Sequence, residues 1–223
     1  MLLQLKNITK GYGDPGMHSY RPVLENLELK IEKGSKLAII GPSGSGKTTL
    51  LNLIGALDLP DFGEVIFDGK DITSYSKNEL ADFRNRHLGF VFQMHHLMPQ
   101  LTLLENVLLP VLPQGKVSKE TTEWAEYLVK KVGIWEQRNQ KPSEMSGGEC
   151  QRTAVVRALI NKPELILADE PTGALDEANA KALTELLIKL SEEEKVTLVT
   201  VTHSAEMAAS MDKKLVLKNG KLH

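Results

Sequence analysis

The sequence feature that most constrains the fold is a glycine-rich segment between an apolar run and a helix-like run. Residues 41–48 read GPSGSGKT and fit the phosphate-loop pattern G-x-x-x-x-G-K-[ST]. The apolar run Leu37–Ile40 is typical of a buried strand, and Thr49–Ile54 is typical of a helix. A strand, a loop without bulky side chains and a helix N-terminus together place backbone N–H groups around phosphate. The sequence therefore predicts a nucleotide-binding loop.

Two side chains of this loop carry specific expectations. Lys47 is expected to reach the β- and γ-phosphates, and the Thr48 hydroxyl is expected to bind Mg²⁺. A glycine-rich turn without function is the alternative. The expected nucleotide contacts of the segment are Gly41, Pro42, Ser43, Gly44, Ser45, Gly46, Lys47, Thr48 and Thr49.

Composition limits the class of protein. The chain has 223 residues, a formal net charge of −2 and one cysteine, Cys150. A single cysteine excludes an internal disulfide framework, and the absence of a dominant basic stretch argues against nucleic acid as a partner. The N-terminal residues lack a signal-peptide pattern, and no apolar run approaches the ~18 residues of a membrane span. We therefore expect a cytoplasmic chain.

Short β-rich runs and helical runs alternate along most of the sequence. Alternation of this kind predicts an α/β fold with a parallel, helix-covered sheet. A loop is expected at Gly13–Gly16, and a mainly helical region at Leu103–Ile160 that contains a helix at Lys119–Val132. Further helices are expected at Asn179–Leu190 and Ala205–Met211. The expected strands are Leu2–Asn7, Val23–Ile31, Lys36–Ile40, Glu64–Phe67, Leu88–Phe92, Leu165–Ala168, Val196–Val201 and Lys214–Leu217.

Two carboxylates follow the most apolar of these strands. Asp169 and Glu170 come directly after Leu165–Ala168. An acid at the carboxyl end of such a strand can bind Mg²⁺, and the next acid can orient an attacking water. We therefore expect Asp169 to bind the metal and Glu170 to act as the base, with two solvated surface acids as the alternative.

A second anion-binding segment precedes the helical run Thr153–Ile160. Ser146 supplies a hydroxyl and Gly147 and Gly148 supply unhindered N–H groups at a helix N-terminus. This segment lacks a lysine like that of the phosphate loop. It therefore predicts a second contact with phosphate.

In this order, the motifs resemble those of the nucleotide-binding subunit of ATP-binding cassette (ABC) transporters, and the resemblance covers essentially the whole chain. The Ser146–Glu149 segment is similar to the LSGGQ signature of that family. The 52 residues between Gln93 and Ser146 leave room for a helical subdomain. Six ordered features carry the resemblance: the phosphate loop, Gln93, the signature, Asp169-Glu170, Gly173-Ala174-Leu175-Asp176 and His203.

The resemblance implies a role for several residues. Tyr12 would stack on adenine, with an ordinary surface tyrosine as the alternative. Gln93 would contact Mg²⁺ or the water, and His203 would hold the γ-phosphate, although a lone histidine at a strand end is more often structural. The signature residues Ser146, Gly147, Gly148 and Glu149 would contact ATP bound to a second subunit, with Asp176 in the same interface.

The resemblance also implies a domain organisation. The chain would form a single nucleotide-binding domain over 1–223, a P-loop NTPase of ABC type. Its ATPase core, with an N-terminal antiparallel β subdomain, would span about 1–93 and 160–223, and its inserted helical subdomain about 94–159. Met145 and Glu149 depart from the usual Leu and Gln of the signature, and Cys150 replaces a residue that is often Gln or Arg.

The segment that follows Gln93 indicates a branch of the family. His95-His96-Leu97 and the signature resemble those of lipoprotein-releasing (LolD-type) ATPases, within a group that includes macrolide-export (MacB-type) and cell-division (FtsE-type) proteins. Residues near Gln93–Met98 would dock a separate four-helix membrane permease, with core packing as the alternative. Metal binding by the two adjacent histidines is a poor alternative because their side chains diverge.

The predicted function is therefore an ATPase that forms an ATP-dependent homodimer and drives a permease, at the inner face of the membrane. The alternative is a regulatory module of FtsE or antibiotic-sensing type that acts through its permease without transport. A GTPase is disfavoured because Asn161–Glu164 only partly matches a base-recognition motif. A soluble ABC ATPase that clamps nucleic acid is disfavoured because the chain has no long coiled coil or tandem cassette.

Overall fold

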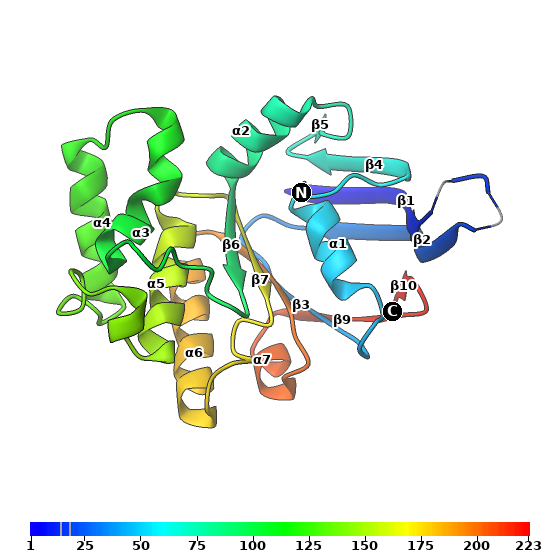
Figure 1. The fold of residues 1–223 in the computed structure, drawn as a ribbon. Helices are drawn as coiled ribbons and strands as arrows, with labels where there is room; N and C mark the ends of the chain where they lie inside the picture. Colours follow the sequence, from blue (N-terminus) through cyan, green and yellow to red (C-terminus); the bar gives the residue numbers. More distant parts are fainter. Residues whose placement is uncertain (14, 18) are drawn as a thin grey trace. The chain divides into compact units, whose positions relative to one another are not determined.

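The computed structural model describes residues 1–13, 15–17 and 19–223, which divide into two compact units (Figure 1). The first unit comprises Met1–Arg84 and Thr197–His223, and the second comprises Asn85–Val196. The predicted subdomain boundaries near 94 and 159 stay a prediction. Asp14, within the expected loop Gly13–Gly16, lies outside the described residues.

The first unit contains a four-stranded antiparallel sheet in the order β2-β1-β4-β5. Apolar side chains alternate along β1, and Leu3, Leu5 and Ile8 are fully buried, as expected for a sheet with one face against a core. Both β1 and β2 extend beyond the strands expected from the sequence. The strands are β1 (Leu3–Tyr12), β2 (Arg21–Ile31), β4 (Phe62–Phe67) and β5 (Lys70–Asp71).

A parallel arrangement in the same unit delivers the phosphate loop. Strand β3 (Lys36–Ile40) pairs in parallel with β8 (Thr197–Val201) and with β9 (Lys213–Lys218). All five residues of β8 are buried, which is typical of a parallel strand covered on both faces. The parallel sheet predicted from the sequence is confirmed here. Helices α1 (Lys47–Ile54) and α7 (Ala205–Ala209) follow β3 and β8.

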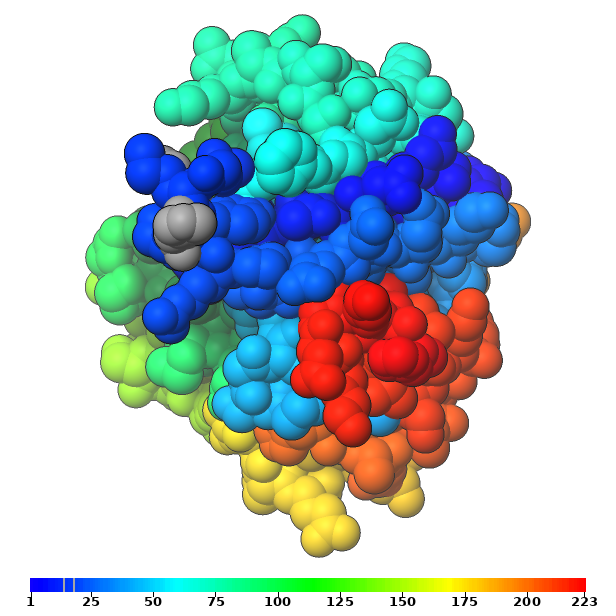
Figure 2. Space-filling model, turned by 90° about the vertical axis from the view of Figure 1, so that its right-hand side faces the viewer, coloured from blue at the N-terminus to red at the C-terminus, as the bar shows by residue number. Residues whose placement is uncertain are grey.

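The end of the chain closes this unit. Strand β10 (Lys221–Leu222) pairs antiparallel with β9, and the backbone N–H of Glu25 in β2 donates to the carbonyl of Gly220 at 3.1 Å. Figure 2 shows the C-terminal residues, in red, against the strands near the N-terminus, in blue. The turn between β9 and β10 therefore lies beside β2.

Helix α2 (Lys77–His87) was missed by the sequence analysis. Only Leu80 and Phe83 of its eleven residues are buried, so that its apolar pattern is weak. The ring of Phe83 packs edge-to-face on Phe67 of β4, with the ring centroids 4.9 Å apart. Tertiary packing therefore compensates for a weak local signal.

The second unit pairs β6 (Leu88–Phe92) in parallel with β7 (Leu165–Asp169) and is otherwise mainly helical. Figure 1 shows its helices grouped together. The predicted helical region is confirmed, with two short 3₁₀ segments at Leu109–Gln114 and Pro142–Glu144. The helices are α3 (Leu103–Leu108), α4 (Lys119–Lys131), α5 (Gly147–Leu159) and α6 (Glu177–Glu193).

Side-chain caps fix where these helices begin. Thr102, Ser118, Ser146 and Asp176 each accept a hydrogen bond from a backbone N–H in the first turn of the helix that follows. Such caps satisfy donors that have no intrahelical partner and contribute about 1 kcal/mol each. Among the residues described, no helix combines the length and apolarity needed to cross a membrane.

Helix α5 lies very close to β6 at Gly89. A Cβ built on Gly89 would lie 2.3 Å from the carbonyl oxygen of Ala158, which is backbone and cannot rotate away. The two elements can therefore approach this closely only because residue 89 has no side chain.

We expect Gly89→Ala to lower the free energy of unfolding by about 2 kcal/mol, because the added methyl group forces β6 and α5 apart. Urea denaturation would measure the loss. Gly147→Ala is the matched control for stability, since open space surrounds Gly147 in the first turn of the same helix. Equal midpoints for Gly89→Ala and the unaltered protein would contradict the proposed close packing.

Candidate site for nucleotide binding and hydrolysis

The phosphate loop connects β3 to α1, as the sequence predicts. Gly46 is the N-cap residue of α1 and has a φ of 96°, in the left-handed region that favours glycine. A Cβ at this position would also lie 2.8 Å from Cγ1 of Val23 in β2. Both the backbone angle and the lack of space therefore require glycine at the start of the helix.

Two polar side chains of the loop, Lys47 and Ser45, differ in their hydrogen bonding. The Lys47 ammonium donates to the carbonyls of Gly41 and Pro42, at 2.9 and 3.0 Å. The Ser45 hydroxyl is buried, and within the described part of the chain it has no hydrogen-bond partner. A buried donor without an acceptor is costly, and a phosphate oxygen would satisfy it. The loop therefore fits a phosphorylated ligand.

The end of β8 lies at the same edge of the sheet as the phosphate loop. Val201 pairs with Ile39, and the N–H of Thr202 donates to the carbonyl of Ile39 at 3.2 Å. His203 follows Thr202, just as Gly41 follows Ile40 on the neighbouring strand. The structure thus brings the chain positions of His203 and of the phosphate loop to one edge of the sheet.

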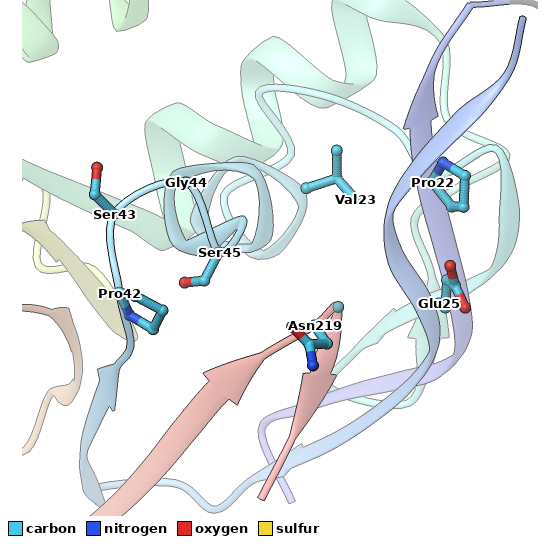
Figure 3. Close-up of a pocket in the computed structure, with 9 residues that line it drawn as sticks. Pro22, Val23, Glu25, Pro42, Ser43, Gly44, Ser45 and Asn219 are labelled. Carbon is cyan, nitrogen blue, oxygen red and sulfur yellow. The ribbon is translucent and has the colours of Figure 1, made fainter.

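A cavity of about 470 Å³ borders the loop within the first unit (Figure 3). Tyr12 ends β1 directly opposite Arg21, one position from a residue that lines this cavity, and 70% of its surface is exposed. An exposed ring at this place can stack on a flat ligand. The cavity is lined by Pro22, Val23, Glu25, Pro42, Ser43, Gly44, Ser45, Asn219 and Gly220.

In the second unit, the predicted polar residues lie at the ends of β6 and β7. Phe92 pairs with Asp169, so that Gln93 and Glu170 both follow a matched pair of strand ends. The Gln93 side chain lies over Gly173, where a Cβ would come within 2.9 Å of Nε2. Glu170 has a φ of 46°, an uncommon backbone conformation for a residue with a side chain. Uncommon backbone angles of this kind concentrate at functional sites.

The signature segment forms the N-terminus of α5. Ser146 accepts a hydrogen bond from the N–H of Glu149, and the Glu149 carboxylate accepts from the N–H and the hydroxyl of Ser146 at 2.7 and 2.8 Å. This capping box accepts either Glu or Gln. The hydrogen bonds from Ser146 lower the pKa of Glu149. Glu149, in place of the usual Gln of the signature, thus preserves the cap of the helix.

Asp176 and the signature come close together within the second unit. Asp176 caps α6 and holds Asn179 through hydrogen bonds of 3.0 Å from its N–H and 2.6 Å from its amide. A Cβ built on Gly148 would lie 3.2 Å from Oδ1 of Asn179. Gly148 therefore leaves room for this neighbour, in addition to leaving its own N–H unhindered.

Helix α5 also holds the segment after β6. The amide of Gln151 donates to the carbonyl of Phe92 at 2.8 Å, and the Arg157 guanidinium donates to the carbonyls of His95 and His96 at 2.7 Å each. His96 has a φ of 48°, which these contacts help to maintain. Gln151 and Arg157 were not predicted as contact residues, because their positions within a helical run carry no local signal for such contacts.

The far end of this segment is held by Asn106, which is fully buried. Its side chain accepts from the N–H of Met98 at 2.7 Å and donates to three carbonyls in the turn before α3. Met94 and Met98 remain exposed, at 65% and 43%, whereas Leu97 is buried. The segment therefore presents two methionines on an anchored backbone.

Comparisons with known proteins agree with this geometry. A model of the ABC transporter family matches residues 24–173, more than half of the chain. The chain belongs to the ABC transporter family. It is 43% identical to the lipoprotein-releasing system ATP-binding protein LolD of Syntrophus aciditrophicus, with 99% of this chain and 98% of the relative covered. It is 46% identical to LolD 2 of Chlorobaculum tepidum, with 100% and 92% covered.

Comparison with solved structures also identifies an ABC cassette. A dimeric structure of the ATP-binding cassette MJ0796, in a post-hydrolysis state bound to ADP and Pi, is 41% identical, with a TM-score of 0.89. The match covers 100% of this chain and 97% of MJ0796. The predicted fold class, a P-loop NTPase of ABC type, is thereby confirmed, and the chain is an ATP-binding ATPase of that family. The roles of individual residues stay predictions.

The described residues hold no cluster of three or more His, Cys, Asp or Glu that could bind a metal ion by itself. Mg²⁺ does not need such a cluster, because it is usually bound by one or two protein oxygens together with phosphates and water. The Thr48 hydroxyl and the Asp169 carboxylate are oxygen ligands of that type. Each of these side chains therefore offers an oxygen of the kind that binds Mg²⁺ together with a nucleotide.

Cys150 lies near a helix N-terminus, where the pKa of a thiol is often lowered, but its surroundings have the opposite effect. Its side chain is buried, and its thiol lies 3.6 Å from the carbonyl oxygen of Pro142. Burial raises the pKa of Cys150, and the charge of Glu149 raises it further. Both effects favour the thiol over the nucleophilic thiolate.

We expect Arg157→Met to release the segment after Gln93, because two hydrogen bonds from a charged group are lost. Hydrogen exchange at the amides of residues 94–98 should accelerate about tenfold or more, corresponding to about 1.4 kcal/mol of lost local stability. Arg86→Met, at an exposed position, is the control. Unchanged exchange in Arg157→Met would show that other contacts hold the segment.

We expect Cys150 to resist alkylation in the folded protein. Iodoacetamide at pH 7.5 should modify it at least about tenfold more slowly than it modifies the urea-unfolded chain, because burial favours the neutral thiol and blocks access. Mass spectrometry of both samples over time would measure the two rates. Comparable rates would show that the first turns of α5 open readily.

Proposed function

We propose that this protein is the ATP-hydrolysing subunit of a lipoprotein-releasing transporter. The observation that carries the proposal is full-length similarity, at 43–46% identity, to two proteins named as LolD. The phosphate loop, the carboxylates after β7 and the signature cap of α5 supply the chemistry that such a subunit needs. MacB-like mechanotransmission export is the second form of the same function.

The phosphate loop neutralises and orients ATP. When ATP binds, Lys47 releases its hydrogen bonds to the loop carbonyls and contacts the β- and γ-phosphates instead. The Ser45 hydroxyl then gains an acceptor. Thr48, Asp169 and Gln93 would hold Mg²⁺, which would supply charge neutralisation when bound. Tyr12 stacks on adenine.

Hydrolysis needs one oriented water molecule. Glu170 accepts a proton from this water, while Gln93 helps to place it and His203 contacts the γ-phosphate. The unusual φ of Glu170 and the contact of Gln93 with Gly173 support this assignment, because both hold polar groups in defined places. The phosphate-loop amides stabilise the developing charge.

We propose that two copies close around two ATP molecules. Ser146, Gly147, Gly148 and Glu149 of one copy then contact the ATP bound to the other, and Asp176 lies in the interface. The dimeric structures of MJ0796 support this assembly. The separate four-helix permease docks near Gln93–Met98, where Met94 and Met98 offer adaptable apolar contacts. This docking would place the subunit at the inner face of the cell membrane.

We expect Glu170→Gln to leave ATP affinity unchanged and to lower turnover by about 100-fold or more, because the amide cannot accept the proton. Phosphate release and equilibrium ATP binding would be measured on the same preparation. Glu185→Gln, at an exposed position of α6, is the control. Retained hydrolysis in Glu170→Gln would remove Glu170 from the role of base.

An affinity purification tests the biological assignment. Tagged Glu170→Gln protein would be recovered from native membranes with ATP and Mg²⁺, and the associated chains identified by mass spectrometry. Two different four-helix permeases would support lipoprotein release. A single permease with a periplasmic adaptor would indicate export, and recovery of no membrane protein would overturn the transporter assignment.

A further inference from the structure

A partly buried charged cluster lies beneath the end of β1, directly before Tyr12. Its centre is the carboxylate of Asp61, which accepts hydrogen bonds from the N–H of Gly11 and from the Tyr20 hydroxyl, both at 2.8 Å. The Lys10 ammonium adds an ion pair with Asp61 at 3.4 Å and one with Asp58 at 3.0 Å. The side chains of Lys10 and Asp61 are each only 17% exposed.

The ring of Tyr20 also packs on the same strand end. A Cβ built on Gly11 would lie 2.7 Å from Cζ of Tyr20 and 2.6 Å from the carbonyl oxygen of Arg21. Residue 11 therefore has to be glycine for the ring to lie here. Tyr20 thus contacts Gly11 with its ring and reaches Asp61 with its hydroxyl, from the far side of the loop between β1 and β2.

The Asp61 carboxylate stays charged and the Tyr20 hydroxyl stays protonated at physiological pH. Burial acts to raise the pKa of Asp61, but the hydrogen bonds from Gly11 and Tyr20 and the charge of Lys10 outweigh it and lower the pKa. Burial and the hydrogen bond to Asp61 raise the pKa of Tyr20 to about 12. A charged acceptor and a protonated donor therefore face each other throughout the neutral range, and such hydrogen bonds are stronger than neutral ones.

The position of Tyr12 depends on this cluster. Tyr12 is the last residue of β1, and its side chain is 70% exposed, so that little packing holds it. Its backbone follows Gly11, whose N–H is held by Asp61 and whose Cα is covered by Tyr20. On the other side, Tyr12 and Gly11 pair with Arg21 and Pro22 of β2.

We propose that Tyr20 and Asp61 are positioning residues for recognition of the nucleotide base, because they fix the end of β1 that presents Tyr12. The inference rests on the proposed contact between Tyr12 and adenine. An exposed ring on a mobile strand end loses conformational freedom when it stacks on a ligand, which weakens binding. A strand end that is already fixed avoids this loss.

The inference predicts a change in affinity that depends on the base. In Tyr20→Phe the ring still covers Gly11, but the hydrogen bond to Asp61 is lost. We expect the Kd of ADP to rise about fivefold and the Kd of tripolyphosphate, which has no base, to stay within about 1.5-fold. Asp61→Asn, which removes the charged acceptor, should give the same pattern. Displacement calorimetry with Mg²⁺ would measure both affinities.

Two controls separate positioning from a general loss of structure. Unchanged tripolyphosphate affinity shows that the phosphate loop of the variant is folded. Tyr127→Phe removes a tyrosine hydroxyl that accepts a hydrogen bond from Lys131 in the second unit, and it should alter neither affinity. Equal weakening of ADP and tripolyphosphate by Tyr20→Phe would overturn the inference, because it would indicate a disturbed phosphate loop.

The variant Tyr12→Ala, alone and combined with Tyr20→Phe, distinguishes failure of this inference from failure of the proposed base contact. If Tyr12→Ala weakens ADP and Tyr20→Phe adds nothing in that background, Tyr20 acts through Tyr12. If Tyr12→Ala weakens ADP but Tyr20→Phe alone does not, the positioning role is wrong and the base contact stands. If Tyr12→Ala leaves the affinity for ADP unchanged, the proposed base contact is wrong and the inference falls with it.

Discussion

The candidate site of the first unit depends on the N-terminus of helix α1, whose first backbone N–H groups lie beyond the reach of the helix's own carbonyls. The first turn of any helix leaves such donors, and here the loop after β3 gathers them around a space suited to phosphate. Two conditions make this possible. The parallel strands β3 and β8 end at the same edge of the sheet, and Gly46 adopts a backbone angle that a side chain would oppose. The buried strands therefore fix the place of the loop, and the loop fixes where nucleotide chemistry occurs.

In the second unit, helix α5 organises the remaining polar groups. Its N-terminus is the signature segment, its side chains hold the backbone from Phe92 to His96, and its close approach to Gly89 seats it on β6. A movement of this helix would therefore carry the segment that presents Met94 and Met98 with it. This mechanical connection, made by Gln151 and Arg157, is consistent with the proposed transmission of closure around ATP to a permease.

Much of this organisation could be predicted from local sequence. The phosphate loop, the strands on either side of the chemistry and the family were predicted, because each depends on residues that are adjacent or regularly spaced. Helix α2 was missed because its pattern has few apolar positions. Burial, which the sequence alone does not report, raises the pKa of Cys150. The role of Glu149 in the cap of α5 was not predicted, although Ser146 and Glu149 have the S-x-x-E spacing of a capping box.

Local sequence is sufficient to identify the backbone segments that can bind phosphate, because glycine angles, helix caps and strand periodicity act over a few residues. The distant side chains that hold those segments in place could be identified only from the folded chain. Asp61 reaches Gly11 and Tyr20 across 50 and 41 positions of the chain, and Arg157 reaches His95 across 62. Contacts of this kind leave no local pattern, since a partly buried carboxylate or guanidinium is stable only where folding brings several partners to it.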